Sequence, residues 1–220
     1  MATKTDQTGA FRKYVVEFIG TFFLVMCICM TEGGGLGEFA PLAIGVTLMI
    51  MVYAGGYISG SHFNPAVTVA VYLRGKLDAG DVLPYMLGQF LGSTLAVMLA
   101  GFLLTSTQAP EPMTKELDIV PTLIAEILGT LFCVYVYLNM FTTRRTSGNT
   151  YFGIVIGLAY MVSLYMFQSI STGAFNPAVA LGITMANITS WSSIWIFIVS
   201  NFVGGVLAAF LSQYVNGPDI

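Results

Sequence analysis

The residues best suited to contact a solute belong to one pentapeptide that occurs twice in this 220-residue chain. Its two copies are Phe63-Asn64-Pro65-Ala66-Val67 and, 112 residues later, Phe175-Asn176-Pro177-Ala178-Val179. Asn is a favoured N-cap, Pro is favoured at the first helical position and Ala is the best helix former, so each copy predicts the start of a helix. The Asn64 and Asn176 amides can also donate hydrogen bonds to an uncharged molecule with a lone pair, such as water.

Both copies lie in long uncharged stretches of a strongly apolar chain. Hydrophobic residues make up 56% of the sequence and charged residues 9%, whereas soluble domains average about 45–50% and about 25%. This composition excludes a soluble globular protein, a disordered chain and a nucleic-acid-binding protein, since a net charge of −3 offers no basic face for phosphates. One histidine and three cysteines leave no material for a metal cluster, and no cofactor is expected.

The apolar stretches predict an all-α integral membrane protein. A spanning helix needs about 20 apolar residues. By that criterion six transmembrane helices are predicted, at roughly 12–31, 40–59, 82–104, 121–142, 150–171 and 191–214. Two shorter helices, 65–73 and 177–187, start at the Asn-Pro-Ala motifs and are too short to span. They are predicted to be re-entrant half-helices, because broken backbone at membrane depth must be buried in protein or line a wet cavity.

The basic residues predict the orientation of these spans. With six spans both termini lie on one side, which receives seven of the eight basic residues: Lys4, Arg12, Lys13, Arg74, Lys76, Arg144 and Arg145. The opposite loops carry Lys115 and the acidic residues Glu32, Glu38, Glu111, Glu116 and Asp118. The N- and C-termini are therefore expected in the cytoplasm, and the membrane is expected to be the plasma membrane.

Two further matches indicate an internal repeat. Glu17-Phe18-Ile19-Gly20-Thr21 matches Glu126-Ile127-Leu128-Gly129-Thr130, and Gln89-Phe90-Leu91-Gly92 resembles Asn201-Phe202-Val203-Gly204. Residues 1–220 are thus predicted to form one channel domain of two repeats, approximately 10–105 and 119–215. Each repeat holds three spans, an odd number, so the second enters the membrane upside down. Such inverted repeats place their shared site near the midplane.

The two half-helices are predicted to meet at that midplane by their N-termini. Each contributes about half a positive charge from its macrodipole, so a narrow lumen between them disfavours cations. A water molecule held by Asn64 and Asn176 would use its oxygen as an acceptor and could not readily pass a proton along a donor chain. The expected chemistry is selective passage of uncharged molecules.

The chain resembles the aquaporins, also called major intrinsic proteins, over nearly its whole length. The resemblance rests on both Asn-Pro-Ala motifs, the Glu-x-x-Gly-Thr pair and Ser59-Gly60-Ser61-His62-Phe63-Asn64-Pro65-Ala66-Val67-Thr68. It implies six spans with two re-entrant half-helices, passive conduction of water or small uncharged solutes, and a homotetramer with one pore per subunit. It also implies that Asn64 and Asn176 donate at the midplane and that Glu17 and Glu126 hold the re-entrant loops.

The two glutamates and the single histidine leave alternatives open. Glu17 and Glu126 could form a proton relay in a coupled transporter, although their matched places in two repeats favour a scaffold. His62 lies two residues before the first motif. In the family such a histidine shapes the loop and can line the pore. The alternatives are a packed, hydrogen-bonded loop histidine and, less favoured, a pH gate based on the usual range of its pKa.

One position departs from the family pattern. Most members place Arg immediately after the second Asn-Pro-Ala, where it lines the outer selectivity filter, whereas this chain has Val179. Counted from the motifs, the other filter positions fall at Ile44, Leu164 and Gly173, with Tyr165 replacing Leu164 if the loop is one residue shorter. These residues predict an apolar and wide constriction. It could admit glycerol, urea or undissociated metalloid acids, or it could slow water by dewetting.

Three functional classes fit these features. A passive channel for water and small uncharged solutes, embedded in the lipid bilayer, is the leading interpretation. A secondary active transporter is also built from inverted repeats, and a structural membrane protein with little conductance would have the same pattern of spans. An enzyme is not expected, because the sequence holds no Ser/His/Asp set, metal-ligand cluster or phosphate-binding loop.

Overall fold

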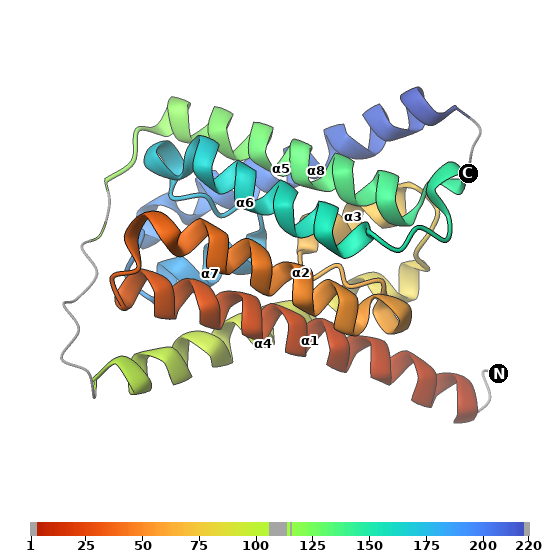
Figure 1. Ribbon diagram of the computed structural model, residues 1–220, viewed down its shortest axis with the longest axis horizontal. Coiled ribbons are helices and arrows are strands. Elements are labelled where there is room, and N and C mark those ends of the chain that lie inside the picture. Colours follow the sequence, from red (N-terminus) through yellow and green to blue (C-terminus); the bar gives the residue numbers. More distant parts are fainter. Residues whose placement is uncertain (1–3, 106–113, 115, 218–220) are drawn as a thin grey trace.

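The computed structural model describes residues 4–105, 114 and 116–217, and the elements in this part of the chain are all helices (Figure 1). The α-helices are α1 (Lys4–Gly33), α2 (Ala40–Ser59), α3 (Pro65–Leu73), α4 (Ala79–Thr105), α5 (Ile119–Phe141), α6 (Phe152–Ser171), α7 (Pro177–Met185) and α8 (Ile194–Asn216). Short 3-10 helices, η1 (Gly37–Phe39), η2 (Arg144–Thr146) and η3 (Trp191–Ser193), precede α2, α6 and α8. The predicted all-α fold is confirmed.

Six of the described helices are long and apolar enough to cross a membrane, which confirms the predicted number of spans. Helix α1 starts at Lys4 rather than near residue 12, because helical hydrogen bonding continues through polar residues that an apolar criterion does not detect. Helix α3 occupies 65–73 as predicted. Helix α7 ends at Met185 instead of residue 187, since Asn187 adopts a left-handed φ of 58° that terminates a helix.

The six long helices run along one common axis, and the two short helices lie among them (Figure 1). Helix α1 packs on α4, α5 on α8, and α2 on α6. Helix α3 lies toward the end that holds both termini, and α7 lies toward the opposite end (Figure 1). Each half-helix packs on a long helix from the other half of the chain, α3 on α8 and α7 on α4.

Two glycines of the matched segments lie where these long helices approach each other most closely. A Cβ on Gly92 would lie 2.4 Å from the carbonyl oxygen of Phe18, and a Cβ on Gly204 would lie 2.7 Å from that of Ile127. Small residues allow such backbone contact between membrane helices. The recurrence of glycine at these two positions therefore reflects the α1–α4 and α5–α8 crossings.

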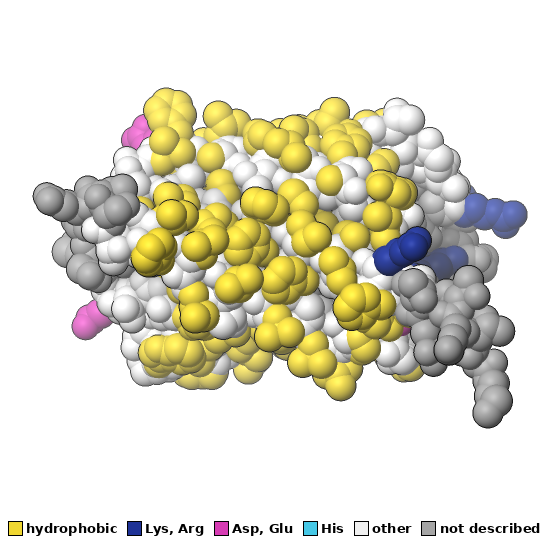
Figure 2. Space-filling view, turned by 90° about the horizontal axis from the view of Figure 1, so that it is seen from below, with side chains coloured by type: hydrophobic (Ala, Val, Ile, Leu, Met, Phe, Trp, Pro, Cys, Tyr) yellow, Lys and Arg dark blue, Asp and Glu magenta, His cyan; other side chains and the backbone are white. Residues whose placement is uncertain are grey.

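The surface between the two ends of the molecule is a belt of apolar side chains (Figure 2). Every long helix contributes exposed large hydrophobic residues to it, among them Phe23, Ile50, Leu91, Leu128, Leu158 and Phe210. Lys and Arg side chains gather at the end where α1 begins and α8 ends, and acidic side chains are visible at the other end (Figure 2). Lys115, predicted at that other end, lies outside the described residues. This is the surface of an integral membrane protein.

The close contact between α1 and α4 predicts that a side chain at position 92 is not tolerated. Gly92→Ala is expected to destabilise the protein by about 1–3 kcal/mol, because the added Cβ meets backbone that cannot move aside as a side chain could. Thermal unfolding in detergent measures this. Gly101→Ala on the same helix is the matched control, since its Cβ meets nothing within 4 Å. Equal unfolding temperatures for the two variants would contradict the crossing.

Candidate functional site

Both half-helices begin at the Asn-Pro-Ala motifs, as predicted, and the asparagines act as N-caps. The Asn64 backbone is extended, with φ −155°, and its Oδ1 accepts a hydrogen bond from Ala66 N at 2.8 Å. The Oδ1 of Asn176 likewise accepts from Ala178 N at 2.9 Å. Because each amide oxygen is bound to its own helix, each Nδ2 is directed away from that helix.

The two asparagines also join the motifs to each other. Asn64 Nδ2 donates to the Phe175 carbonyl at 2.9 Å, and Asn176 Nδ2 donates to the Phe63 carbonyl at 2.8 Å. Sequence reasoning missed this reciprocal pair, which joins residues more than 100 positions apart. An amide NH2 group has two N–H bonds. One N–H of each asparagine therefore serves the structure, and one remains for the cavity that both residues line.

Glu126 is completely buried and binds the loop that precedes the second motif. Its Oε1 accepts from Ser171 Oγ at 2.7 Å and from Ala174 N at 2.9 Å, and its Oε2 accepts from Phe175 N at 2.8 Å. Phe175 has a φ of 46°, in a region that residues other than glycine rarely adopt. The carboxylate thus supplies the hydrogen bonds that hold this unusual backbone in place.

Glu17 binds the loop before the first motif in the same way, also from a fully buried position. It accepts from Ser59 Oγ at 2.7 Å, His62 N at 2.9 Å and Phe63 N at 2.7 Å. Gln89 Nε2 is an additional donor, at 2.8 Å. Two of these partners are backbone N–H groups of the loop, and the other two are a side-chain hydroxyl and a side-chain amide. A scaffold is expected to have such partners, whereas a proton relay is not.

The glycine of each Glu-x-x-Gly-Thr segment makes room for the phenylalanine of the motif it supports. A Cβ on Gly20 would lie 2.0 Å from the Phe63 ring, and a Cβ on Gly129 would lie 2.3 Å from the Phe175 ring. In each half, therefore, the glutamate binds the loop backbone and the glycine three residues later receives the ring. This explains physically why the two sequence patterns recur together.

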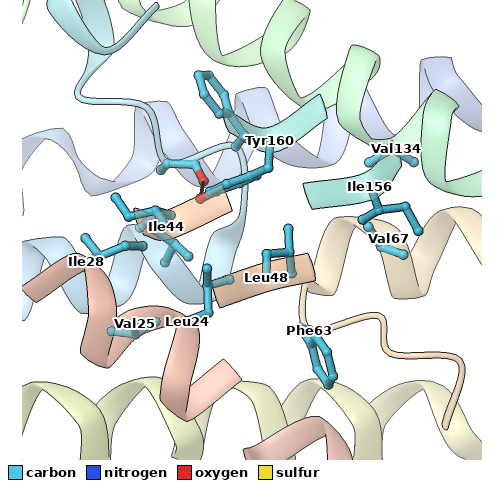
Figure 3. Packing of buried hydrophobic residues seen from close by; sticks show 14 of the residues in the cluster. Leu24, Val25, Ile28, Ile44, Leu48, Phe63, Val67, Val134, Ile156 and Tyr160 are labelled. Atoms are coloured by element: carbon cyan, nitrogen blue, oxygen red, sulfur yellow. Dashed lines mark hydrogen bonds between the residues drawn. The ribbon is translucent and has the colours of Figure 1, made fainter. Parts of the chain in front are cut away.

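A small cavity of about 30 Å³ lies where the two motifs meet. Asn64, Asn176 and His62 line it together with apolar side chains of the surrounding helices, several of which Figure 3 shows: Leu24, Leu48, Val67, Ile156 and Tyr160. A cavity needs at least about 10–15 Å³ to hold a water molecule. The cavity thus has room for a single small polar molecule beside the asparagine amides.

His62 is packed and lines this cavity at the same time. Its Nδ1 lies 3.1 Å from Thr68 Oγ1, and its ring contacts the rings of Tyr85 and Tyr137, with centroid distances of 4.9 and 5.7 Å. The side chain is only 6% exposed. None of these described contacts involves a charged group. The geometry therefore agrees with both the packed and the pore-lining interpretations of this residue.

A larger cavity of about 360 Å³ opens on the side away from the termini, and all four predicted filter residues line it. Ile44, Leu164, Gly173 and Val179 come from α2, α6, the loop before α7, and α7. Tyr165 is 51% exposed and donates to the Glu38 carbonyl at 3.1 Å, so Leu164 holds the position for which both were considered. Glu32 also lines this cavity, whereas none of the described lining residues is Lys or Arg.

Gly173 lies against the Leu164 side chain. Gly173 has a φ of +77°, and a Cβ there would lie 2.6 Å from Leu164 Cδ2. The Leu164 side chain therefore occupies the space where a side chain on Gly173 would lie. Leu164, Ile44 and Val179 are each no more than 3% exposed. The side chains at these three positions are apolar and buried.

The chain is similar to known proteins in both sequence and fold. The family profile described as Major intrinsic protein matches residues 39–212. The Glycerol uptake facilitator protein-like 6 of Lactiplantibacillus plantarum is 31% identical, over 94% of this chain and 100% of that protein. Aquaporin NIP1-1 of Zea mays is also 31% identical, over 94% and 77%. The X-ray structure of the aquaglyceroporin from Plasmodium falciparum shares the fold, with a TM-score of 0.80, 19% identity, and coverage of 95% and 98%.

The loop contacts of Glu126 can be tested by substitution. Glu126→Gln is expected to destabilise the protein by about 1–3 kcal/mol, because an NH2 group replaces an accepting oxygen and leaves a buried backbone N–H of Ala174 or Phe175 without a partner. Thermal unfolding in detergent is the measurement. Ser171→Ala is the matched control, with a smaller expected loss, since it removes the hydroxyl contacts with Glu126 and Gly173 N but leaves both backbone hydrogen bonds to Glu126. An unchanged unfolding temperature for Glu126→Gln would contradict this account.

Proposed function

The chain belongs to the major intrinsic protein family, and we propose that it is a broadly selective member that passes small uncharged solutes as well as water. Family membership makes it a passive channel rather than an enzyme. Its relatives include proteins named for glycerol uptake and proteins named aquaporins. Glycerol, urea and undissociated metalloid acids are the proposed cargo besides water.

The observation that carries this proposal is the composition of the outer cavity. Ile44, Leu164, Gly173 and Val179 line it, and no Lys or Arg is among its described lining residues. A filter that contains a guanidinium offers strong hydrogen-bond donors and a fixed positive charge. An apolar ring instead accepts the carbon skeleton of a polyol, or the compact body of an undissociated acid, without leaving a buried charge unpaired.

Exclusion of ions is assigned to the midplane. Asn64 and Asn176 are proposed to donate to the passing molecule with the N–H that each has available. The N-termini of α3 and α7 add their partial positive charges at the same level. Pro65, Ala66, Pro177 and Ala178 set these helix starts. Glu17 and Glu126 are proposed as loop scaffolds, and His62 as a pore-lining residue.

Orientation and assembly complete the proposal. The end that holds the described basic residues is proposed to face the cytoplasm, with both termini there, in agreement with the positive-inside rule. The plasma membrane is the proposed location, and a homotetramer with one pore per subunit is the proposed assembly. Residues 1–220 are proposed to act as one channel domain built from repeats of approximately 10–105 and 119–215.

Val179→Arg is expected to narrow the range of solutes. The longer, charged side chain fills the apolar ring, so glycerol and urea fluxes should fall by about tenfold or more relative to water flux, the scale at which pocket size discriminates. Stopped-flow light scattering on proteoliposomes measures all three fluxes. Val179→Leu separates added bulk from added charge. Unchanged glycerol and urea fluxes in Val179→Arg would show that the filter is assigned to the wrong residues.

Asn176→Asp is expected to admit cations. The substitution replaces a donor with a carboxylate at the level of the two helix N-termini, and a negative charge there offsets their positive potential. Planar-bilayer recordings under a proton gradient should show a current in this variant and none in the unmodified protein. Asn187→Asp, in an exposed turn, is the control for the added charge. A substantial proton current through the unmodified protein would refute exclusion by the midplane alone.

A further inference from the structure

A groove of about 440 Å³ lies outside the pore, at the ends of α1, α4 and α7 that are remote from the termini. Cys29 of α1, Gly101 and Phe102 of α4, and Met185 and Ile188 at the end of α7 line it. Helix α4 crosses α1 and runs away from it toward this end (Figure 1). The volume falls within the range of about 300–1,000 Å³ that is typical of ligand pockets.

The mouth of this groove opens on the lipid-facing surface. Phe102 is 73% exposed and Met98 is 64% exposed, and both belong to the spanning segment Ala79–Thr105. In an integral membrane protein such side chains contact hydrocarbon. The polar side chains of Thr105 and Asn187 lie at the end of the span, and no Asp, Glu, Lys or Arg is among the described lining residues. The groove therefore suits an uncharged chain whose polar end lies at the membrane surface.

We propose that this groove binds one acyl chain of a membrane phospholipid. The hydrophobic effect does not select the occupant, since lipid tails are as apolar as the groove. Packing does, because an unfilled space of this size deprives its walls of dispersion contacts. Water is a poor filler beside Val97, Met98 and Phe102, whose side chains offer it no hydrogen bonds. A flexible chain from the surrounding leaflet can enter through the mouth and fill the groove.

The bound chain would lie directly behind a wall of the pore. Ile188 lines both this groove and the outer pore cavity. On α1, Cys29 lines the groove and its neighbour Ile28 lines the pore cavity. The turn that carries Ile188 is fixed by a hydrogen bond from Ile188 N to the Ile183 carbonyl, 2.9 Å long. The chain thus completes the packing of the segment that separates the pore from the bilayer.

Filling the groove with protein tests the proposal. Gly101 lines the groove and a Cβ there meets nothing within 4 Å, so Gly101→Trp is expected to direct an indole into the groove. Gly80→Trp, on the same helix and with equally open surroundings, is the matched control. Each protein is reconstituted in dioleoylphosphatidylcholine, extracted in mild detergent and weighed by native mass spectrometry. The unmodified protein and Gly80→Trp should retain one phospholipid per chain, and Gly101→Trp should lose it.

The other outcomes count against the proposal. A phospholipid retained by Gly101→Trp, or one absent from the unmodified protein, would place the chain elsewhere. A change in subunit number without a change in bound lipid would identify the groove as an interface between copies. Displacement of the lipid by glycerophosphocholine, which has no chains, would show that the headgroup is bound instead. Gly101→Leu serves as a second variant that fills the groove. Water flux through each variant, measured in parallel, shows whether the protein is folded. Because the lipid count does not depend on which solutes pass, the test of this groove is independent of the proposed solute range.

Discussion

Unsatisfied backbone groups cost several kcal/mol each inside a membrane, and this chain interrupts two helices at that depth. The loops before α3 and α7 are subject to that constraint, and buried Glu, Asn and Tyr side chains satisfy their backbone groups. Glu17 and Glu126 accept from the loop N–H groups, while Asn64 and Asn176 bind the carbonyls of the opposite loop. The half-helices, and with them the lumen, depend on these hydrogen bonds.

The same arrangement determines the electrostatics of the lumen. Because carboxylates bind the loops from behind, the helix N-termini and the amide N–H groups are left facing the cavity between the motifs. The positive ends of two helix dipoles and hydrogen-bond donors thus face the cavity at one level without a Lys or Arg among its described lining residues. That combination favours neutral acceptors over cations. A lysine or arginine at this depth would need a carboxylate as a partner, and the carboxylates of Glu17 and Glu126 already accept hydrogen bonds from the loop backbone.

Local signals made part of this structure predictable. Asn-Pro-Ala defines a helix start within three residues, so the start of each half-helix was predictable from sequence, and 65–73 was predicted in full. The bonds between Asn64 and Phe175, and between Asn176 and Phe63, join residues that only the folded chain brings together. The contact of the Leu164 side chain with Gly173 depends on how the loop after α6 folds back against that helix. Residue counting identified the positions around the outer cavity, but it could not give the space between them.

The two halves are less alike in their surroundings than in their motifs, and this bears on selectivity. Gln89 donates to Glu17 and to Thr68, whereas its counterpart Asn201 accepts from Thr130 and donates to the Phe197 carbonyl. Glu126 therefore holds its loop without an amide donor from α8. That half supplies Leu164, Gly173 and Val179 to the outer cavity, and Val179 leaves its described lining without a cation. Under the proposed function, the residues around the outer cavity select solutes by size and polarity. Ions are excluded at the midplane, where the two Asn-Pro-Ala motifs meet.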